Sequence, residues 1–204
     1  IFYITEYTPY INTRLVKSEE IPNSWKDLLA PRWVGNMSFS DPNVLVAPYE
    51  FIAVLVENKV WDEDYIRALY RQKLRFTANQ PDEFRLLAAG ESQLLIRGTD
   101  SQGATFAREG APIRAIGMKE GVAVSPSPAA AIAGGPHPNA ARVFLNWLLS
   151  REGQVVLGEA MGSKMNRKDV PDFRPKAVQA TVTKTLPTNI EHLEKATELL
   201  RQKW

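Results

Sequence analysis

Short apolar runs alternate with amphipathic segments along most of the chain. Residues 1–11 form a strand-like run of aromatic and β-branched residues, in which Pro9 indicates an edge or a crossing point. Further short strands are predicted at residues 37–39, 74–77, 94–96 and 113–116. Between them, apolar residues recur at helical spacing, as at Tyr65, Ile66 and Leu69. This βαβ succession predicts an α/β fold with a largely parallel sheet that helices cover on both faces.

Start and stop signals predict where several helices begin and end. Ser24, with Asp27 three residues later, indicates a helix start, and Pro31 closes that helix after about two turns. Pro81 in a first turn and Gly90 just past an end bracket the helix that precedes the strand at 94–96. Other predicted helix starts are Pro48, Asp62, Ser150 and Thr188.

The pattern changes near residue 120. Residues 121–124 are strand-like, and the Ser-Pro-Ser-Pro that follows forces an extended path, as at a crossing between two domains. Residues 162–175 form a basic, irregular loop. Between these segments, Pro138 opens an amphipathic helix with an apolar face made of Ala141, Phe144, Leu145 and Leu148.

Composition narrows the function classes. The chain has 204 residues, 44% of them apolar, which is enough for a core in one domain or two small ones. Lys and Arg number 25 against 23 Asp and Glu, and no dense basic stripe occurs, so a nucleic-acid partner is not predicted. The absence of cysteine excludes disulfides and thiolate metal sites. No apolar run approaches the ~18 residues of a membrane span, and no signal peptide is present. Because the chain starts at Ile1 without Met, we expect a processed product or a fragment.

Polar side chains follow two of the predicted strands. Residues 97–102, Arg-Gly-Thr-Asp-Ser-Gln, come directly after the strand at 94–96, and residues 40–43, Ser-Asp-Pro-Asn, follow the strand at 37–39. In open α/β sheets, ligands bind beyond the carboxyl ends of the strands. Thr99 and Gln102 also match a capping box, so the start of the next helix would offer unpaired N–H groups. An ordinary turn with its cap is the alternative interpretation of this segment.

Residues for catalysis or metal binding do not form a recognisable set. His137 and His192 stand alone, without neighbouring His or Cys ligands. No Gly-x-Ser-x-Gly motif occurs, and Gly134-Gly135 lacks the Gly-Lys-Ser/Thr ending of a phosphate-binding loop. The sequence therefore predicts no catalytic site, no metal site and no bound cofactor.

Two blocks of sequence resemble a known family. The first consists of Asn12-Thr13-x-Leu15-Val16 and Ile21-Pro22-x-Ser24-Trp25-x-Asp27-Leu28-Leu29-x-Pro31-x-Trp33-x-Gly35. The second is His137-Pro138-Asn139-Ala140-Ala141-x-x-Phe144-x-x-Trp147-Leu148-Leu149-Ser150-x-Glu152-Gly153-Gln154. With the Gly90-Glu91 turn between them, the chain resembles the ferric-ion-type extracellular solute-binding proteins of ABC transporters. This resemblance implies a two-lobed α/β fold of the periplasmic-binding-protein type II. Such a protein lies in the periplasm or elsewhere outside the cytoplasm, closes on a small-molecule ligand and delivers it to a membrane ABC permease.

The resemblance also implies how the chain divides. Residues 12–121 with 175–204 would form an essentially complete second lobe, whereas residues 1–11 and 122–174 would supply the crossing strands and part of the first lobe. Family members carry a further N-terminal segment that builds most of the first lobe. We therefore expect the apolar face of residues 141–148 to be exposed in this chain, with the missing segment or a second copy of the chain as its partner.

The residues after the strand at 94–96 bear on the ligand. Iron-binding members of the family use adjacent tyrosines at this point, where this chain has Arg-Gly-Thr-Asp, which argues against iron. Arg97 requires an anion, and either Asp100 or a ligand could supply it. We predict a small, anionic organic solute bound by Arg97, Thr99, Asp100, Ser101, Ser40, Asn43 and Tyr10. The alternatives are a ferric-ion transport protein, a transferase-type enzyme on the same two-lobed fold, and a sensory or interaction domain.

Overall fold

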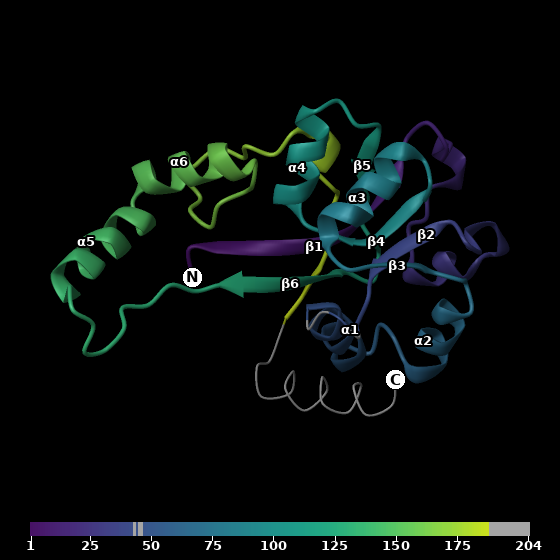
Figure 1. The fold of residues 1–204 in the computed structure, drawn as a ribbon, viewed down its shortest axis with the longest axis horizontal. Helices are drawn as coiled ribbons and strands as arrows, with labels where there is room; N and C mark the ends of the chain where they lie inside the picture. The colour runs from purple at the N-terminus through teal and green to yellow at the C-terminus, as the bar shows by residue number, and fades with distance from the viewer. Residues whose placement is uncertain (43, 45–46, 188–204) are drawn as a thin grey trace.

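A mixed β-sheet organises the chain (Figure 1). The computed structural model describes residues 1–42, 44 and 47–187. The strands in these residues are β1 (Tyr3–Asn12), β2 (Met37–Ser40), β3 (Arg75–Thr77), β4 (Leu94–Gly98), β5 (Ile113–Ala115), β6 (Val122–Ser127) and β7 (Thr185–Leu186). Their order is β3-β2-β4-β1-β6-β7, and β5 also pairs with β1. The strands predicted from the sequence are confirmed to within two residues, except that β6 continues three residues beyond its predicted end.

Helices connect the strands, and most predicted starts are confirmed. The α-helices are α1 (Ala47–Glu57), α2 (Glu63–Tyr70), α3 (Gln80–Ala89), α4 (Asp100–Arg108), α5 (Pro138–Leu149) and α6 (Arg151–Met161). Short 3-10 turns are η1 (Ser18–Glu20), η2 (Trp25–Leu29), η3 (Pro31–Trp33) and η4 (Lys176–Val178). Ser24, Asp62 and Ser150 each accept a backbone N–H at a helix start, as capping requires, although the helix after Ser24 is of the 3-10 type. The helix predicted from Thr188 lies outside the described residues.

The sheet is less parallel than the sequence predicted. β2 runs parallel to β3 and β4, and β6 runs parallel to β7. β1, however, is antiparallel to β4, β5 and β6, so the prediction of a largely parallel sheet is wrong around β1. The reason is the connection from β1 to β2, which consists of short 3-10 turns and contains no crossover helix.

β1 and β6 form a ribbon that leaves the main body of the protein towards α5 and α6 (Figure 1). Residues 3–7 of β1 pair with residues 123–127 of β6, while residues 10–12 pair with β4 and β5. Pro9 lies between these two parts of β1, at the point where the register with β4 shifts. Its carbonyl accepts the N–H of Ile116 at 2.9 Å. The structure therefore agrees with the prediction that Pro9 marks a crossing point.

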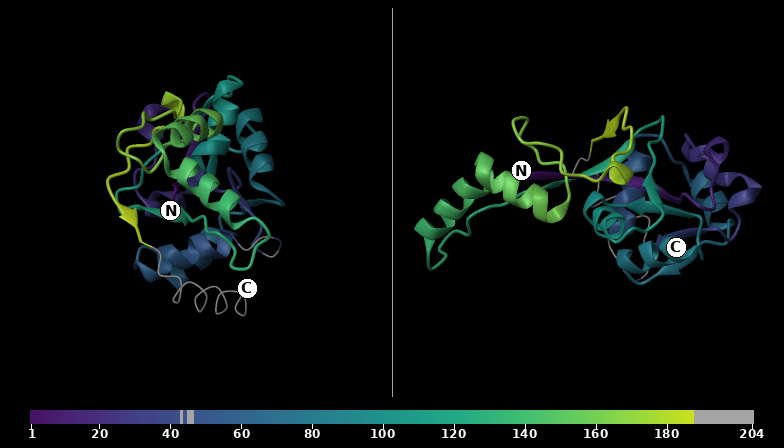
Figure 2. Two further views of the ribbon diagram at one scale, coloured as in Figure 1. Left: turned by 90° about the vertical axis from the view of Figure 1, so that its left-hand side faces the viewer. Right: turned by 90° about the horizontal axis from the view of Figure 1, so that it is seen from above.

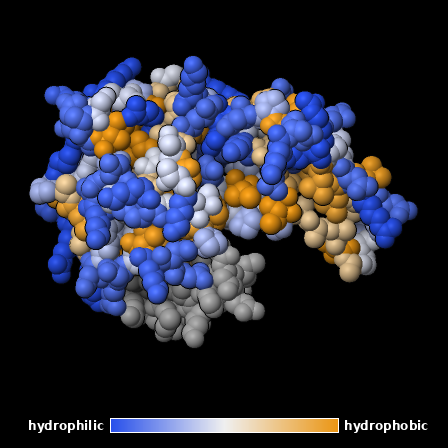
Figure 3. Space-filling view, turned by 180° about the vertical axis from the view of Figure 1, so that it is seen from behind, coloured by the Kyte–Doolittle hydropathy of each residue, from blue (hydrophilic) through white to orange (hydrophobic). Residues whose placement is uncertain are grey.

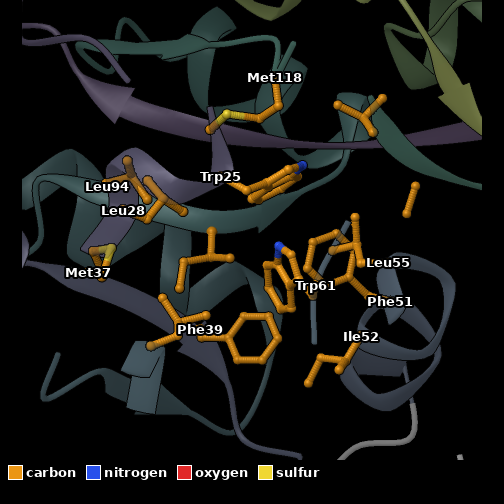
Figure 4. Close-up of a cluster of buried hydrophobic side chains, with 14 of the residues drawn as sticks. Trp25, Leu28, Met37, Phe39, Phe51, Ile52, Leu55, Trp61, Leu94 and Met118 are labelled. Carbon is orange, nitrogen blue, oxygen red and sulfur yellow. The ribbon is translucent and has the colours of Figure 1, made fainter. Parts of the chain in front are cut away.

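Apolar clusters lie on both faces of the sheet, as predicted. In the first cluster, which includes α1 and α2, Trp25, Phe51 and Trp61 meet edge to face with ring centroids 5.4 to 5.9 Å apart (Figure 4). The second cluster lies under α3 and α4. Leu94 enters the first cluster and Leu95 the second, because successive side chains of a strand point to opposite faces. Each large apolar side chain buried in this way contributes about 1.5–3 kcal/mol.

Helices α5 and α6 form an arm that projects beyond the sheet (Figures 1 and 2). Leu148 is the one residue of α5 that is fully buried. Val143 and Phe144 are 69% and 56% exposed, and Leu149 and Val156 are also exposed. Apolar side chains gather along this arm in the space-filling view (Figure 3). Of the apolar face predicted for α5, Phe144 is exposed, Ala141 and Leu145 are half-buried and Leu148 is buried, so its exposure is confirmed only in part.

Candidate functional site

Polar side chains meet at the carboxyl ends of the parallel strands β2 and β4. Ser40 ends β2 and Arg97 lies next to the end of β4, while Glu83 lies on α3, which contacts both strands. Gln80 and Thr99 adjoin them. We call these five residues the edge cluster. It occupies the end of the strands at which the sequence predicted a ligand, in keeping with the general position of binding sites in open α/β sheets.

Glu83 is a fully buried acid within the edge cluster. The Ser40 hydroxyl donates a hydrogen bond to its Oε1, and its Oε2 has no hydrogen-bond partner among the described residues. Burial raises the pKa of Glu83 to about 8, although the hydrogen bond from Ser40 and the charge of Arg97 act in the opposite direction. The carboxyl group is therefore mostly protonated and neutral at pH 7.

Arg97 carries a buried charge without a matching carboxylate. The side chain is 6% exposed, and its guanidinium carbon lies 4.4 Å from the centre of the Tyr7 ring. Its Nε is buried and has no hydrogen-bond partner, and no ion pair joins Arg97 to a carboxylate in the described part of the chain. Because Glu83 is mostly neutral at pH 7, the edge cluster holds an excess positive charge that an anion would neutralise.

Hydrogen bonds hold the backbone of the edge cluster in place. The Gln80 side-chain N–H donates to the carbonyl of Arg97 at 3.0 Å, and its side-chain oxygen accepts the Thr99 hydroxyl at 2.7 Å. Thr99 also caps α4 by accepting the N–H of Gln102 at 3.5 Å. The first turn of α3, the end of β4 and the start of α4 are therefore joined, which suits a binding site because such sites need rigid supports.

Asp100 does not pair with Arg97. The Tyr3 hydroxyl donates to its Oδ1, and the N–H of Ser101 donates to the same oxygen at 2.9 Å. Burial raises the pKa of Asp100 despite these hydrogen bonds. The alternative in which Asp100 supplies the anion for Arg97 is therefore wrong for this structure. Ser101 is half-buried at the start of α4.

Tyr10 lies in the apolar core and not at an open edge. It is fully buried, its hydroxyl donates to the carbonyl of Thr99 at 3.1 Å, and its ring meets that of Phe84 edge to face at 4.9 Å. Gly98 and Gly103 leave room for the ring, since a Cβ at either position would collide with it. Tyr10 thus stabilises the turn before α4 from within the core, and its full burial keeps it out of contact with a ligand. Asn43, another predicted ligand residue, lies outside the described residues.

The sequence analysis missed Glu83, Gln80 and Tyr7. A signal existed for Glu83, because it stands one helical turn before the buried Leu87 and so places an acid on the apolar face of α3. No comparable signal exists for Tyr7. Its place beside Arg97 depends on the pairing of β1 with its neighbours, which are distant in sequence.

Within the residues that the structure describes, no group of three or more His, Cys, Asp or Glu side chains could hold a metal ion. Within the same residues, no helix combines the length and the apolar content that a membrane span requires.

Comparisons with known proteins identify a family. A family model described as bacterial extracellular solute-binding protein matches residues 1–186. An uncharacterized protein of Haemophilus influenzae is 30% identical over 151 residues, which make up 71% of this chain and 43% of that protein. The chain therefore spans less than half the length of this relative.

Solved structures share the fold. The periplasmic binding protein AfuA from Actinobacillus pleuropneumoniae, with fructose-6-phosphate bound, has a TM-score of 0.65 and 22% identity, covering 100% of this chain and 66% of AfuA. Iron-bound HitA from Pseudomonas aeruginosa has a TM-score of 0.77 and 20% identity, covering 98% of this chain and 66% of HitA. The chain spans about two thirds of the length of each structure, and at these identities the likeness concerns the fold alone.

Proposed function

Since this chain belongs to the bacterial extracellular solute-binding protein family, we propose that it binds a small, anionic organic solute at the edge cluster for an ABC importer. Family membership confirms the resemblance found in the sequence and the predicted location outside the cytoplasm. The mixed α/β fold matches that of periplasmic binding proteins over about two thirds of their length, which is consistent with one nearly complete lobe and one partial lobe.

The observation that carries this proposal is the unpaired charge of Arg97. Its guanidinium is almost fully buried, its Nε lacks a hydrogen-bond partner, and the neighbouring acid is mostly neutral at pH 7. A carboxylate or phosphate can accept two parallel hydrogen bonds from a guanidinium group. The start of α4 adds the positive end of a helix dipole, which favours an anion, whereas the Thr99 hydroxyl already donates to Gln80. Ser40 acts indirectly, because its hydroxyl already binds Glu83.

Calorimetry with defined anions tests the proposal. We suggest fructose-6-phosphate, which is bound in the AfuA structure, and citrate as probes. Arg97→Ala should weaken the binding of whichever probe binds by about 2 kcal/mol, or roughly 30-fold, the scale for losing a charge-assisted pair in a desolvated site. Arg114→Ala, which removes an exposed arginine on β5, is the matched control and should leave the affinity unchanged.

Two outcomes would contradict the proposal. One is an equal affinity of the wild type and Arg97→Ala for the anion. The other is the absence of binding by either probe, combined with native mass spectrometry that finds no anion retained by the purified chain.

We also propose that the chain acts by binding and not by catalysis. Ser40 and Glu83 are a hydroxyl and an acid in hydrogen-bond contact, as a nucleophile and its base would be, but a catalytic base is oriented by a third group, and the Oε2 of Glu83 has no hydrogen-bond partner among the described residues. The donor set also disfavours ferric iron, which prefers anionic oxygen ligands. Arg97 is cationic, and burial raises the pKa of Tyr10, so its hydroxyl stays protonated.

If the chain acts as a solute-binding protein, the arm formed by α5 and α6 requires a polypeptide partner. We propose that residues 12–121 with 175–204 act as the second lobe, and that residues 1–11 and 122–174 supply crossing strands and part of the first lobe. The exposed apolar face of α5 would then pack against the polypeptide that completes the first lobe, or against a second copy of this chain. A membrane ABC permease would receive the solute from the assembled protein.

A further inference from the structure

A cavity with a volume of about 320 Å³ lies against the β1–β6 ribbon. Ile4 and Glu6 of β1 and Val124 of β6 line one side of it. The loop after α6, Arg174 and the start of α4 line the other sides. We call this space the ribbon cavity. Its volume lies within the range of small-molecule sites, which is about 300–1,000 Å³.

The ribbon cavity is separate from the edge cluster. Neighbouring side chains of a strand point to opposite faces, so Glu6 and Tyr7 lie on different faces of β1. Tyr7 packs against Phe51 of α1 and lies under the guanidinium of Arg97. Glu6 instead pairs with Arg174 at the wall of the ribbon cavity. A molecule in the ribbon cavity would therefore lie across β1 from Arg97.

Most charged groups in the wall of the ribbon cavity already have partners. Arg174 donates to Glu6 at 2.9 Å and to Asp172 at 2.7 Å, and Asp100 accepts the hydroxyl of Tyr3. Glu6 and Arg174 are therefore joined in an ion pair, and Asp100 is held by the hydrogen bond from Tyr3.

Two lysines of the wall have no such partner. Lys164 and Lys168 line the same cavity and make no hydrogen bond or ion pair with any of the described residues. Lys164 acts on Asp172 through its charge alone. Two exposed lysines with free ammonium donors therefore border a cavity whose remaining surface includes the apolar side chains of Ile4, Val124 and Met165.

We propose that the ribbon cavity is a second binding site, for a small organic carboxylate with a short apolar body. The carboxylate group binds to Lys164 and Lys168 through charge-assisted hydrogen bonds. The apolar body packs against Ile4, Val124 and Met165, which removes it from water. This inference does not depend on the solute proposed for Arg97, because the two lysines that carry it lie outside the edge cluster, although the start of α4 adjoins both sites.

Hexanoate is a suitable probe. Its binding to the 204-residue chain can be monitored by NMR of methyl groups. The methyl signals of Ile4, Val124 and Met165 should shift in a saturable manner. Replacing both lysines, in Lys164→Gln/Lys168→Gln, should weaken binding by at least about tenfold, the factor expected for one lost charge-assisted bond. Hexanol, which has the same carbon chain without the charge, should bind at least about tenfold more weakly than hexanoate for the same reason.

A control variant with the same change of charge separates a specific site from general attraction. Lys26→Gln/Lys176→Gln removes two exposed lysines that do not line the cavity, and it should bind hexanoate as the wild type does. Arg97→Ala should also keep the affinity, which separates this test from that of the proposed function. Equal weakening in both lysine pairs, shifts confined to residues outside the ribbon cavity, or dependence on Arg97 would each overturn the proposal.

Discussion

Replacing the buried acid Glu83 by glutamine should remove a large, pH-dependent cost to stability. Glutamine keeps the shape of the side chain and an oxygen that can accept the hydroxyl of Ser40, but it cannot ionise. In the wild type, the folded carboxyl keeps its proton up to a pH of about 8, since its pKa lies there, whereas the unfolded one loses it above its usual pKa of 4.5. Between these two values the folded state binds more protons, so the stability of the wild type falls as pH rises.

The magnitude follows from the two pKa values. The difference between about 8 and 4.5 is about 3.5 pH units, and each unit corresponds to about 1.4 kcal/mol. The full cost at and above pH 8 is therefore about 5 kcal/mol, relative to a pH below 4.5. This is comparable with the total stability of many domains, which is about 5–15 kcal/mol. Glu83→Gln should not show this cost.

Urea unfolding at several pH values measures the effect. Between pH 5 and pH 9, the unfolding free energy of Glu83→Gln minus that of the wild type should increase by about 4 kcal/mol, because most of the titration range lies within this interval. Glu91→Gln replaces an exposed acid just beyond the end of α3 and should change by less than about 0.5 kcal/mol over the same range. A difference between Glu83→Gln and the wild type that stays constant with pH would show that Glu83 ionises normally, and it would remove the argument for the unpaired charge of Arg97.

Three further predictions concern packing, iron and association. Gly103→Ala would place a Cβ against the Tyr10 ring, so its unfolding free energy should fall by about 1–3 kcal/mol in urea unfolding; an unchanged value would contradict the packing of Tyr10. Titration with ferric citrate should produce no visible tyrosinate-to-iron absorption band, because Tyr10 is buried and Arg97 is cationic. Sedimentation should show a dimer or a bound second fragment, and Phe144→Ser should weaken this association; a wild-type monomer of 22.9 kDa would count against an uncovered arm.

Local patterns in the sequence were sufficient to predict most elements of this protein. Capping depends on residues within one turn of each other, so Ser24, Asp62 and Ser150 could be recognised directly as helix starts. The apolar run of β4 and the polar residues after it likewise located the end of the sheet where the edge cluster lies. The amphipathic character of α5 was also predictable, since its apolar spacing is visible in the sequence.

Only the tertiary structure decided which polar groups meet. Ser40 and Glu83 are 43 residues apart, and Tyr3 and Asp100 are 97 apart, so their hydrogen bonds depend on how the strands pair. The antiparallel direction of β1 also brought Tyr7 to Arg97, on the face of the strand opposite to Glu6. Burial then set the charge of Glu83, because desolvation depends on the packed surroundings and not on neighbours in the chain. The sequence by itself thus determined the elements and the region of the site, whereas the pairing of distant segments determined its charge.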